Sequence, residues 1–492
     1  MKDLKEKTIR GGFARLAGQG ANFALRMGSL MVLARLLMPA DFGLVGMVTA
    51  LTGVLVLFRD FGLSAAAVQS ANVTEDQISN LFWINLLVGV LLSLLLVGAA
   101  PAVAAFYHEP RLVAVTAVLA LSFLFNAAGV QHGAVLQRQM RFTALTIINT
   151  VSLAVGTVAG ICGALMGYGY WALVIMTVLP PFAASLGYWL ATGWLPNRPR
   201  KGSGIGSMMR FGGTLTVNGL VVYLASNFEK VLLGRYWGAD AIGIYGRAYQ
   251  LVNIPTSNLN TAAGEVTFAA LSRVQDDPGR LRRYFLNAYS LVLAMTVPLT
   301  ILCALFPSDV ILVLLGPKWK AAIPIFRLLA PTILVFAVAN PLGWLLPAVG
   351  LVTRSLKMSM TIAPIMIVSY IIALPYGPKG VAFAYSAVMV LWLVPLIAWA
   401  VHRTPVSFGD ILLTASKPAA CGILAGAFAF AVRLTCGHLL PPLPRLVLES
   451  SVLLTVFSVM LLFVAGQKSL YLDLLRGLKR SRPVDEESLV SA

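Results

Sequence analysis

The chain has 492 residues, of which 58% are hydrophobic and only 11% are charged. Soluble domains carry roughly 25% charged residues, so a soluble protein of this length could not cover its surface with so few charges. The same hydrophobic content excludes a disordered chain. A net charge of +18 in so apolar a chain indicates basic loops that meet anionic lipid, and not a nucleic-acid partner. We therefore expect an integral membrane protein.

Taken in chain order, apolar runs long enough to cross a bilayer recur between charged or Pro/Gly-rich breaks. A membrane helix needs roughly 20 mainly apolar residues. Fourteen runs meet this length, and short alternating strands are absent, so the expected fold class is an all-α membrane protein. The predicted spans are residues 12–37, 42–64, 79–104, 112–133, 143–166, 169–192, 207–228, 241–268, 284–306, 321–349, 356–374, 380–401, 416–436 and 446–465.

Lys and Arg collect in every second loop, including the one that holds Arg280, Arg282 and Arg283. Cytoplasmic loops carry such an excess, so we expect both termini in the cytoplasm and a multi-pass protein of the bacterial inner membrane. The predicted loops are too short for a soluble catalytic domain, and neither a phosphate-binding loop motif nor H-E-x-x-H occurs. We expect no enzyme activity, no catalytic residue, no metal and no organic cofactor.

A faint internal repeat appears at an offset of 200 residues. Gly43 and Gly46 match Gly243 and Gly246, and the L-A-R sequence at 33–35 matches L-G-R at 233–235. An offset that spans six helices keeps both copies in the same orientation, which is typical of transporters with a site between parallel lobes. The predicted parts are a lobe of six helices at 1–200, a second at 201–402, two additional helices at 403–466 and a cytoplasmic tail at 467–492.

Polar residues follow one face of the first predicted helix. Arg15, Gln19, Asn22, Arg26 and Ser29 are spaced by four, three, four and three residues, which places all five on one helix face. An arginine that faced lipid near the middle of the bilayer would cost at least ~2.5 kcal/mol, so this face is expected to line a wet cavity. Two alternatives stay open: Arg15 reaches the interface, and Arg26 forms a buried ion pair.

Further polar residues lie on three other predicted spans and would face the same cavity. Arginines outnumber acids in this set, and guanidinium groups bind phosphates through paired donors, so an anionic phosphate or pyrophosphate group is the expected ligand. The alternatives are that Arg210 reaches the interface and that Arg59–Asp60 and Arg247–Glu265 are structural pairs. The candidate substrate-binding residues are Arg15, Arg26, Arg59, Arg210, Arg247, Gln19, Asn22 and Asn218.

Two acidic residues in the spans are candidates for ion coupling. Asp60 and Glu265 lie among the polar residues described above. A carboxylate within the membrane can take up and release H⁺ or bind Na⁺ when its surroundings disfavour the ionised form. H⁺ or Na⁺ is therefore the expected coupling ion.

Eight segments of the chain form an ordered set of motifs: LARLLMPADFGL (33–44), FRDFGLSAAAVQ (58–69), FWINLLVGV (82–90), AFYHEP (105–110), QRQMRF (137–142), GYGYWAL (167–173), LLGRYWGADAIGIYGRAYQL (232–251) and LLGPKWKAAIPIFRLLA (314–330). In this order they resemble the polysaccharide transporter family, the Wzx-like flippases of the multidrug/oligosaccharidyl-lipid/polysaccharide (MOP) exporter superfamily. The resemblance implies a MOP flippase-like fold and alternating access. It also implies export of undecaprenyl-pyrophosphate-linked oligosaccharide units for exopolysaccharide, capsule or O-antigen (lipopolysaccharide) synthesis, with membrane lipids and a polysaccharide polymerase and export machinery as candidate partners.

Three other classes compete with this interpretation. An ion-coupled multidrug antiporter of the same superfamily shares the fold, but cationic drugs favour an acidic cavity. A membrane polymerase or glycosyltransferase would be expected to show a long outer loop or a soluble domain with acidic catalytic residues. A structural scaffold has no need of polar helix faces.

Overall fold

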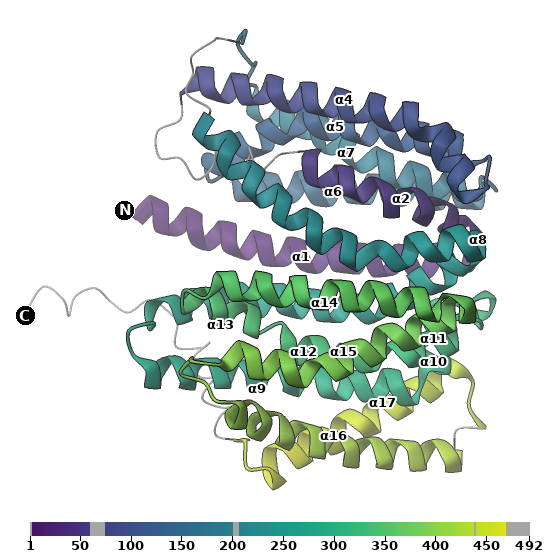
Figure 1. Ribbon diagram of the computed structural model, residues 1–492, viewed down its shortest axis with the longest axis vertical. Helices are drawn as coiled ribbons and strands as arrows, with labels where there is room; N and C mark the ends of the chain where they lie inside the picture. The colour runs from purple at the N-terminus through teal and green to yellow at the C-terminus, as the bar shows by residue number, and fades with distance from the viewer. Residues whose placement is uncertain (1, 60–73, 200–205, 437–438, 469–492) are drawn as a thin grey trace, which may run out of the picture. The chain divides into compact units, whose positions relative to one another are not determined.

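The computed structural model describes residues 2–59, 74–199, 206–436 and 439–468, although some side chains within these ranges, mainly in 2–17 and 206–226, lie outside the description (Figure 1). The described residues are helical and contain no strand. The helices are α1 Lys2–Leu36, α2 Pro39–Arg59, α4 Glu75–Tyr107, α5 Leu112–Arg138, α6 Phe142–Leu165, α7 Tyr170–Thr192, α8 Gly206–Arg273, α9 Pro278–Leu305, α10 Pro307–Leu314, α11 Ala322–Leu329, α12 Pro331–Ala339, α13 Leu342–Ala348, α14 Val352–Ala373, α15 Gly377–Val401, α16 Phe408–Cys436 and α17 Pro442–Val459, with short helical turns at η1 Pro317–Trp319, η2 Leu374–Tyr376 and η4 Met460–Val464.

Ten helical stretches of the described chain are long and apolar enough to cross a membrane. One of these, Thr353–Val401, holds both α14 and α15. With these two separated, and with α1 and the two halves of α8 added, the fourteen predicted spans are all present. Gly238 divides α8, because its φ of 80° and ψ of −174° are not helical. The all-α membrane fold predicted from the sequence is therefore confirmed.

The span predicted at 321–349 is three helices, α11, α12 and α13. Pro331 opens α12 and Pro341 stands directly before α13. Proline lacks the N–H group that would continue the preceding helix, which explains both breaks. By contrast, α7 runs on through Pro180 and Pro181.

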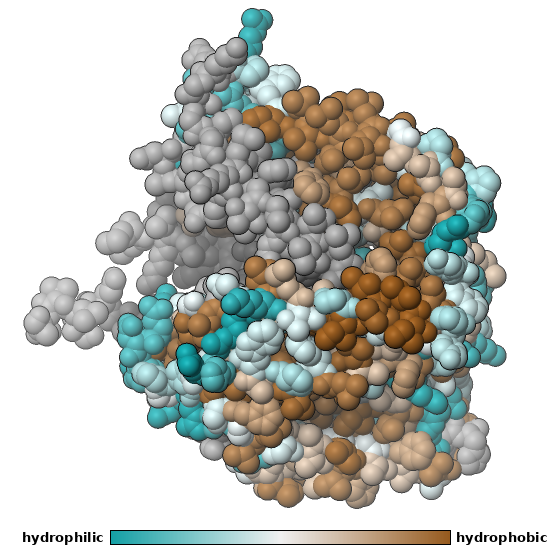
Figure 2. Space-filling model, viewed as in Figure 1, coloured by the Kyte–Doolittle hydropathy of each residue, from teal (hydrophilic) through white to brown (hydrophobic). Residues whose placement is uncertain are grey.

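Large apolar side chains cover the outside of the helices, and apolar residues spread over the face in Figure 2. In the most apolar window of α4, and likewise of α7, only 17% of the residues are buried. Leu94 on α4 is 64% exposed and Leu190 on α7 is 77% exposed. Apolar surface of this extent is stable in lipid and not in water. The protein is a multi-pass membrane protein.

The helices form two compact units. Unit 1 comprises Met1–Arg247, Leu314–Ala322 and Met360–Ala384, and unit 2 comprises the remaining residues. The helix α8 contributes to both units, because the division falls after Arg247. The units group residues by packing and do not follow chain order, so the two six-helix lobes stay a prediction.

Within unit 1, α2 and the second half of α8 cross at small residues. A Cβ atom added to Gly43 would overlap the backbone carbonyl of Ala239, and one added to Gly243 would overlap the backbone carbonyl of Pro39. Both pairs are related by the 200-residue offset of the repeat. The contact is therefore locally two-fold, because each helix places a glycine against the backbone of the other. A larger residue at either glycine would prevent the two backbones from approaching this closely.

The end of α1 is held by a short segment from later in the chain that also belongs to unit 1. The indole Nε1 of Trp319 donates to the carbonyl of Ala34 at 2.8 Å, and Nζ of Lys318 donates to the carbonyl of Leu36 at 3.0 Å. Trp319 is fully buried. The last carbonyls of a helix lack partners in their own helix, so these donors complete the end of α1.

The chain that leaves α7 is bound to the ends of α4 and α5. Nε2 of His132 donates to the carbonyl of Trp194 at 3.2 Å, and the indole of Trp83 donates to the carbonyl of Asn197 at 2.8 Å. The backbone N–H of Asn197 donates to Oγ of Ser79 at 3.0 Å. These bonds hold residues 193–197 on unit 1.

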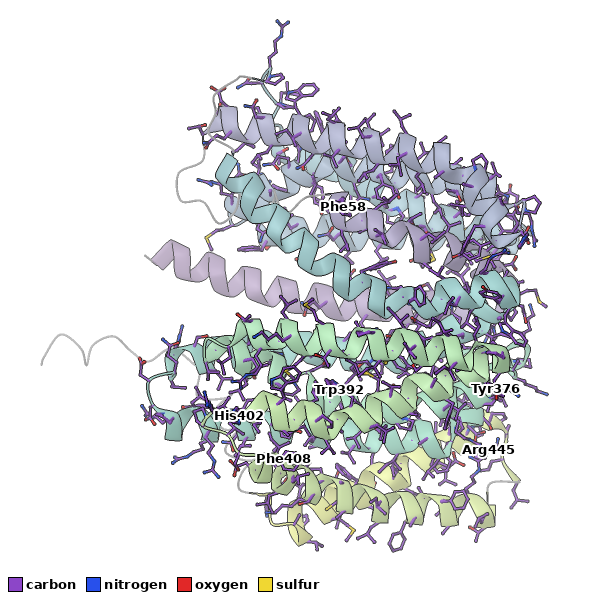
Figure 3. The ribbon with its side chains drawn as sticks, in the orientation of Figure 1. Phe58, Tyr376, Trp392, His402, Phe408 and Arg445 are labelled. Carbon is purple, nitrogen blue, oxygen red and sulfur yellow. The ribbon has the colours of Figure 1, made fainter. Side chains whose placement is uncertain are left out.

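In unit 2, a buried group of charges joins α10, α16 and α17. Asp309 is fully buried and accepts from Nε of Arg445 at 2.8 Å, while its other oxygen lies 3.1 Å from Nη1 of Arg433. The same Nη1 lies 3.7 Å from Oε1 of Glu449. Arg445 is labelled near the start of α17 in Figure 3. This group attaches the two C-terminal helices to the rest of unit 2.

Candidate substrate-binding cavity

Unit 1 contains a cavity of about 780 Å³ between α1, α5, α6 and α7. Ligand pockets commonly have volumes of roughly 300–1,000 Å³, so this cavity has room for a small ligand or a few sugar rings. Thirteen of its 22 lining residues are polar or glycine. The lining residues are Gly18, Gln19, Asn22, Arg26, Phe125, Asn126, Gly129, Val130, Gly133, Ala134, Gln137, Phe142, Leu145, Thr146, Asn149, Ser152, Leu153, Pro180, Pro181, Ala184, Ser185 and Tyr188.

The α1 side of the cavity consists of residues that the sequence places on one helix face. Gln19, Asn22 and Arg26 line the cavity. Ser29, one turn further, is buried, and its Oγ donates to the carbonyl of Arg26 at 3.0 Å. Oδ1 of Asn22 is buried without a hydrogen-bond partner among the described residues.

Small residues and prolines on the opposite helices leave the space open. Gly129 and Gly133 on α5 face α7, where a Cβ added to Gly133 would only touch the ring of Tyr188, at 3.6 Å. Pro180 and Pro181 lie in the middle of α7 and line the cavity. Since glycine has no side chain and proline fills little volume, a packed helix bundle keeps a hollow here.

Neutral hydrogen-bonding groups dominate the side of the cavity that faces α1. The hydroxyl of Tyr188 donates to Oδ1 of Asn149 at 2.6 Å, which orients both side chains. Nδ2 of Asn126 donates to the carbonyl of Ser122 at 2.7 Å, which leaves its Oδ1 as an acceptor. Amides and hydroxyls of this kind match the hydroxyls of a carbohydrate, which both donate and accept.

Arg26 is the single charged residue among the described residues that line the cavity. Its guanidinium group offers five donors to a carboxylate or phosphate. The described lining holds no carboxylate beside it. The arrangement therefore suits a neutral or anionic ligand that is rich in hydroxyl groups.

Among the other predicted site residues, the structure describes the side chain of Arg247 alone. The guanidinium of Arg247, at the end of unit 1, lies 4.4 Å from the centre of the Phe42 ring, and Arg247 does not line the cavity. Arg59 ends α2 and Asp60 lies outside the described residues. The side chains of Arg15, Arg210, Asn218 and Glu265 also lie outside the description. A site composed of these residues, and ion coupling by Asp60 or Glu265, stay predictions.

Residues on α5, α6 and α7 were missed by sequence reasoning. Asn126, Gly129, Gly133 and Gln137 recur every three or four residues along α5 and line the cavity together. That spacing is the same signal that identified the face of α1. The signal on α5 is weaker, because no residue of the set is charged and an uncharged amide is far less costly in an apolar helix than an arginine.

The fold matches solved membrane transporters. It superposes on the lipid II flippase MurJ in an inward closed conformation with a TM-score of 0.72 and 13% identity, over 92% of this chain and 98% of that chain. An inward-facing multidrug resistance MATE family transporter of the MOP superfamily gives a TM-score of 0.60 and 13% identity, over 80% of this chain and 96% of that one. The chain thus has the fold of the MOP superfamily.

Residues 32–324 match the polysaccharide biosynthesis protein family, and the chain belongs to this family. The resemblance found in the sequence is confirmed. Teichuronic acid biosynthesis protein TuaB of Bacillus subtilis (strain 168) is 33% identical over 59% of this chain and 61% of its own length. Lipopolysaccharide biosynthesis protein WzxC of Escherichia coli (strain K12) is 25% identical over 73% of each chain. Succinoglycan biosynthesis transport protein ExoT of Rhizobium meliloti (strain 1021) is 22% identical over 67% of this chain and 66% of its own length.

Proposed function

We propose that the protein is a flippase for undecaprenyl-pyrophosphate-linked oligosaccharide units in the bacterial cytoplasmic membrane. It would carry the saccharide headgroup from the cytoplasmic to the outer face by alternating access, with both termini in the cytoplasm, and supply a polymerase and export machinery. The observation that carries the proposal is the amide- and hydroxyl-lined cavity with one arginine. Relatives named for teichuronic acid, lipopolysaccharide and succinoglycan support a polysaccharide precursor as the cargo.

Roles follow from the chemistry of each lining group. Asn126, Asn149 and Tyr188 would hydrogen-bond sugar hydroxyls, and Arg26 would hold the pyrophosphate or an acidic sugar through two parallel donors. The polyprenyl tail would remain in lipid, because moving each CH₂ group into water costs about 0.8 kcal/mol. The protein then has to shelter only the polar headgroup during transfer.

The ion-coupled multidrug antiporter is the second candidate, because a transporter of that class shares the fold. The lining of the cavity favours the flippase, since Arg26 would repel a cationic drug and the part of the lining that the structure describes has no carboxylate to attract it. The two functions predict different phenotypes in the cell.

The experiment is a deletion that is complemented with wild-type, Arg26→Ala, Arg26→Lys and Arg280→Ala forms. Arg280 is exposed at the start of α9, which makes it a matched arginine outside the cavity. Wild type and Arg280→Ala should restore surface polysaccharide. Arg26→Ala should leave lipid-linked units at the cytoplasmic face, and Arg26→Lys should restore little, because lysine lacks the planar fork. Unchanged polysaccharide in the deletion strain, together with raised sensitivity to cationic dyes, would move the assignment to the antiporter.

A further inference from the structure

A second polar feature of unit 1 lies on α8, away from the cavity. Glu229 is 1% exposed, and neither oxygen of its carboxyl group has a hydrogen-bond partner among the described residues. It stands nine residues before the break at Gly238, or about 13 Å along the helix axis. Glu229 directly follows the span predicted at residues 207–228.

Burial outweighs the positive charge beside Glu229. Lys230, the next residue, attracts an ionised Glu229 through its charge, but desolvation by burial is the larger effect. The Nζ of Lys230 donates to Oδ1 of Asn227 at 2.7 Å. Two phenols pack nearby: the hydroxyl of Tyr223 donates to the carbonyls of Thr49 and Ala50, each at 3.1 Å, and the ring of Tyr107 packs on α8 at Gly234. Phenols are neutral at physiological pH and supply no counter-charge.

The repeat shows that packing does not require an acid at this position. The 200-residue offset pairs Glu229 with Ser29, which is 3% exposed. Oγ of Ser29 donates to the carbonyl of Arg26 within its own helix, so a small hydroxyl meets the needs of the buried position in the first copy. The second copy instead carries a carboxyl group whose burial costs free energy and whose oxygens accept from no donor that the structure describes.

We propose that Glu229 is a proton-binding site that couples the transport cycle to the proton gradient. In the state described, the carboxyl group holds a proton and is neutral. In another state of the cycle, the proton leaves to water on one side of the membrane and the carboxylate is ionised; uptake from the other side restores the acid. No electron is transferred. The helix α8 contributes to both compact units. Burying the ionised carboxylate costs free energy, so loss of the proton favours a different position of this shared helix.

The coupling of Glu229 to transport rests on the proposed flippase function. The binding of a proton by Glu229 does not depend on that function. The first measurement is therefore made without any transport substrate. Purified protein in vesicles of phosphatidylethanolamine and phosphatidylglycerol is titrated with acid and base while infrared spectroscopy follows the C=O stretch of protonated carboxyl groups. Wild type should show a protonated carboxyl band at neutral pH that disappears at alkaline pH. Glu229→Gln should lose part of that band and not all of it, because Glu449 is a second buried carboxyl group without a hydrogen-bond partner among the described residues. Glu75→Gln, which removes an exposed acid at the start of α4, should keep the wild-type intensity.

The second measurement is polysaccharide export in the complemented deletion strain. Glu229→Gln keeps the volume and neutrality of the protonated acid but cannot release a proton, so it should be inserted normally and fail to export. If Glu229→Gln is not inserted, Glu229→Ser, which introduces the residue found at the equivalent position of α1, serves the same purpose.

Three results would overturn the proton site: a band of wild-type intensity in Glu229→Gln, normal export by either variant, or a band change that depends on Na⁺ and not on pH. Failure of the wild-type gene to restore polysaccharide would contradict the flippase while leaving the infrared result intact.

Discussion

Gly43 and Gly243 pack in the same way, each against a backbone carbonyl of the helix that carries the other glycine. The partner carbonyls belong to Ala239 and Pro39, which are themselves one repeat apart. A methyl group at either glycine would push two backbones apart, because neither contact is with a movable side chain. We expect Gly243→Ala to destabilise the protein by about 1–3 kcal/mol through overpacking.

Gly246 provides the control for this prediction. It lies one turn further along α8, and a Cβ added there meets nothing within 4 Å. Gly246→Ala should be neutral or stabilising by up to about 1 kcal/mol, since alanine is the better helix former. Thermal unfolding in detergent measures both variants, and equal melting temperatures for the two would contradict the packing argument.

The hydrogen bond from Tyr188 to Asn149 gives a graded test of the cavity. Tyr188→Phe removes the hydroxyl and keeps the ring, and a single neutral hydrogen bond contributes about 1 kcal/mol. If sugar binding depends on an oriented Asn149, the rate of export should fall about fivefold. Tyr168→Phe, at an exposed tyrosine between α6 and α7, is the control and should export at the wild-type rate. A silent Tyr188→Phe would argue against a sugar at this position.

The buried charges of unit 2 predict a large stability effect. Asp309→Asn would leave Arg445 and Arg433 without the carboxylate that both approach, and breaking a buried pair costs about 3–5 kcal/mol. Arg280→Gln alters the exposed pair with Asp277, whose charged atoms are 4.0 Å apart, and should cost less than about 0.5 kcal/mol. Thermal unfolding and protease sensitivity at α16 and α17 test the difference. A mild Asp309→Asn would show that the charges do not attach these helices.

A pH-dependent effect is expected at the loop between α4 and α5. Nε of Arg111 donates to Glu109 at 2.8 Å and Nη2 donates at 2.9 Å, and these bonds hold the pKa of Glu109 below its ordinary value. A lowered pKa in the folded state means that the pair stabilises the protein above the ordinary pKa and loses this effect as the pH falls through the folded value.

The pair is partly exposed, so Arg111→Ala should cost only about 0.5 kcal/mol at neutral pH. The melting temperatures of wild type and Arg111→Ala should converge in acid below roughly pH 4, and also in high salt, which screens exposed charges. A gap that is independent of pH would show that Arg111 acts through packing.

The spans follow from the sequence because length and composition alone decide whether a segment is stable in lipid. Pro331 and Pro341 likewise mark the breaks of the span at 321–349. Half of the cavity follows too, since Arg26 and its neighbours on α1 are polar residues at helical spacing. The opposite half does not, because which faces of α5, α6 and α7 meet α1 is decided by packing between distant segments.

Glu229 escaped sequence reasoning for a different reason. It stands beside Lys230, and an adjacent acid and base near the end of an apolar run are typical of a membrane interface. Only the fold shows that the carboxyl group is buried while Nζ of Lys230 donates to Asn227. Neighbouring residues of a helix point in different directions. Which of Glu229 and Lys230 is buried therefore depends on how α8 is rotated about its axis, and the sequence alone does not give that rotation.

The bonds at Trp194 and Asn197 limit how far the first half of the chain can move from the second. Between the end of α7 and the start of α8, residues up to Asn197 are tied to α4 and α5. Eight residues, 198–205, separate Asn197 from Gly206. Eight residues of any chain span at most roughly 28 Å. Any rearrangement that carries the start of α8 away from Asn197 is therefore limited to about this distance by chain length alone.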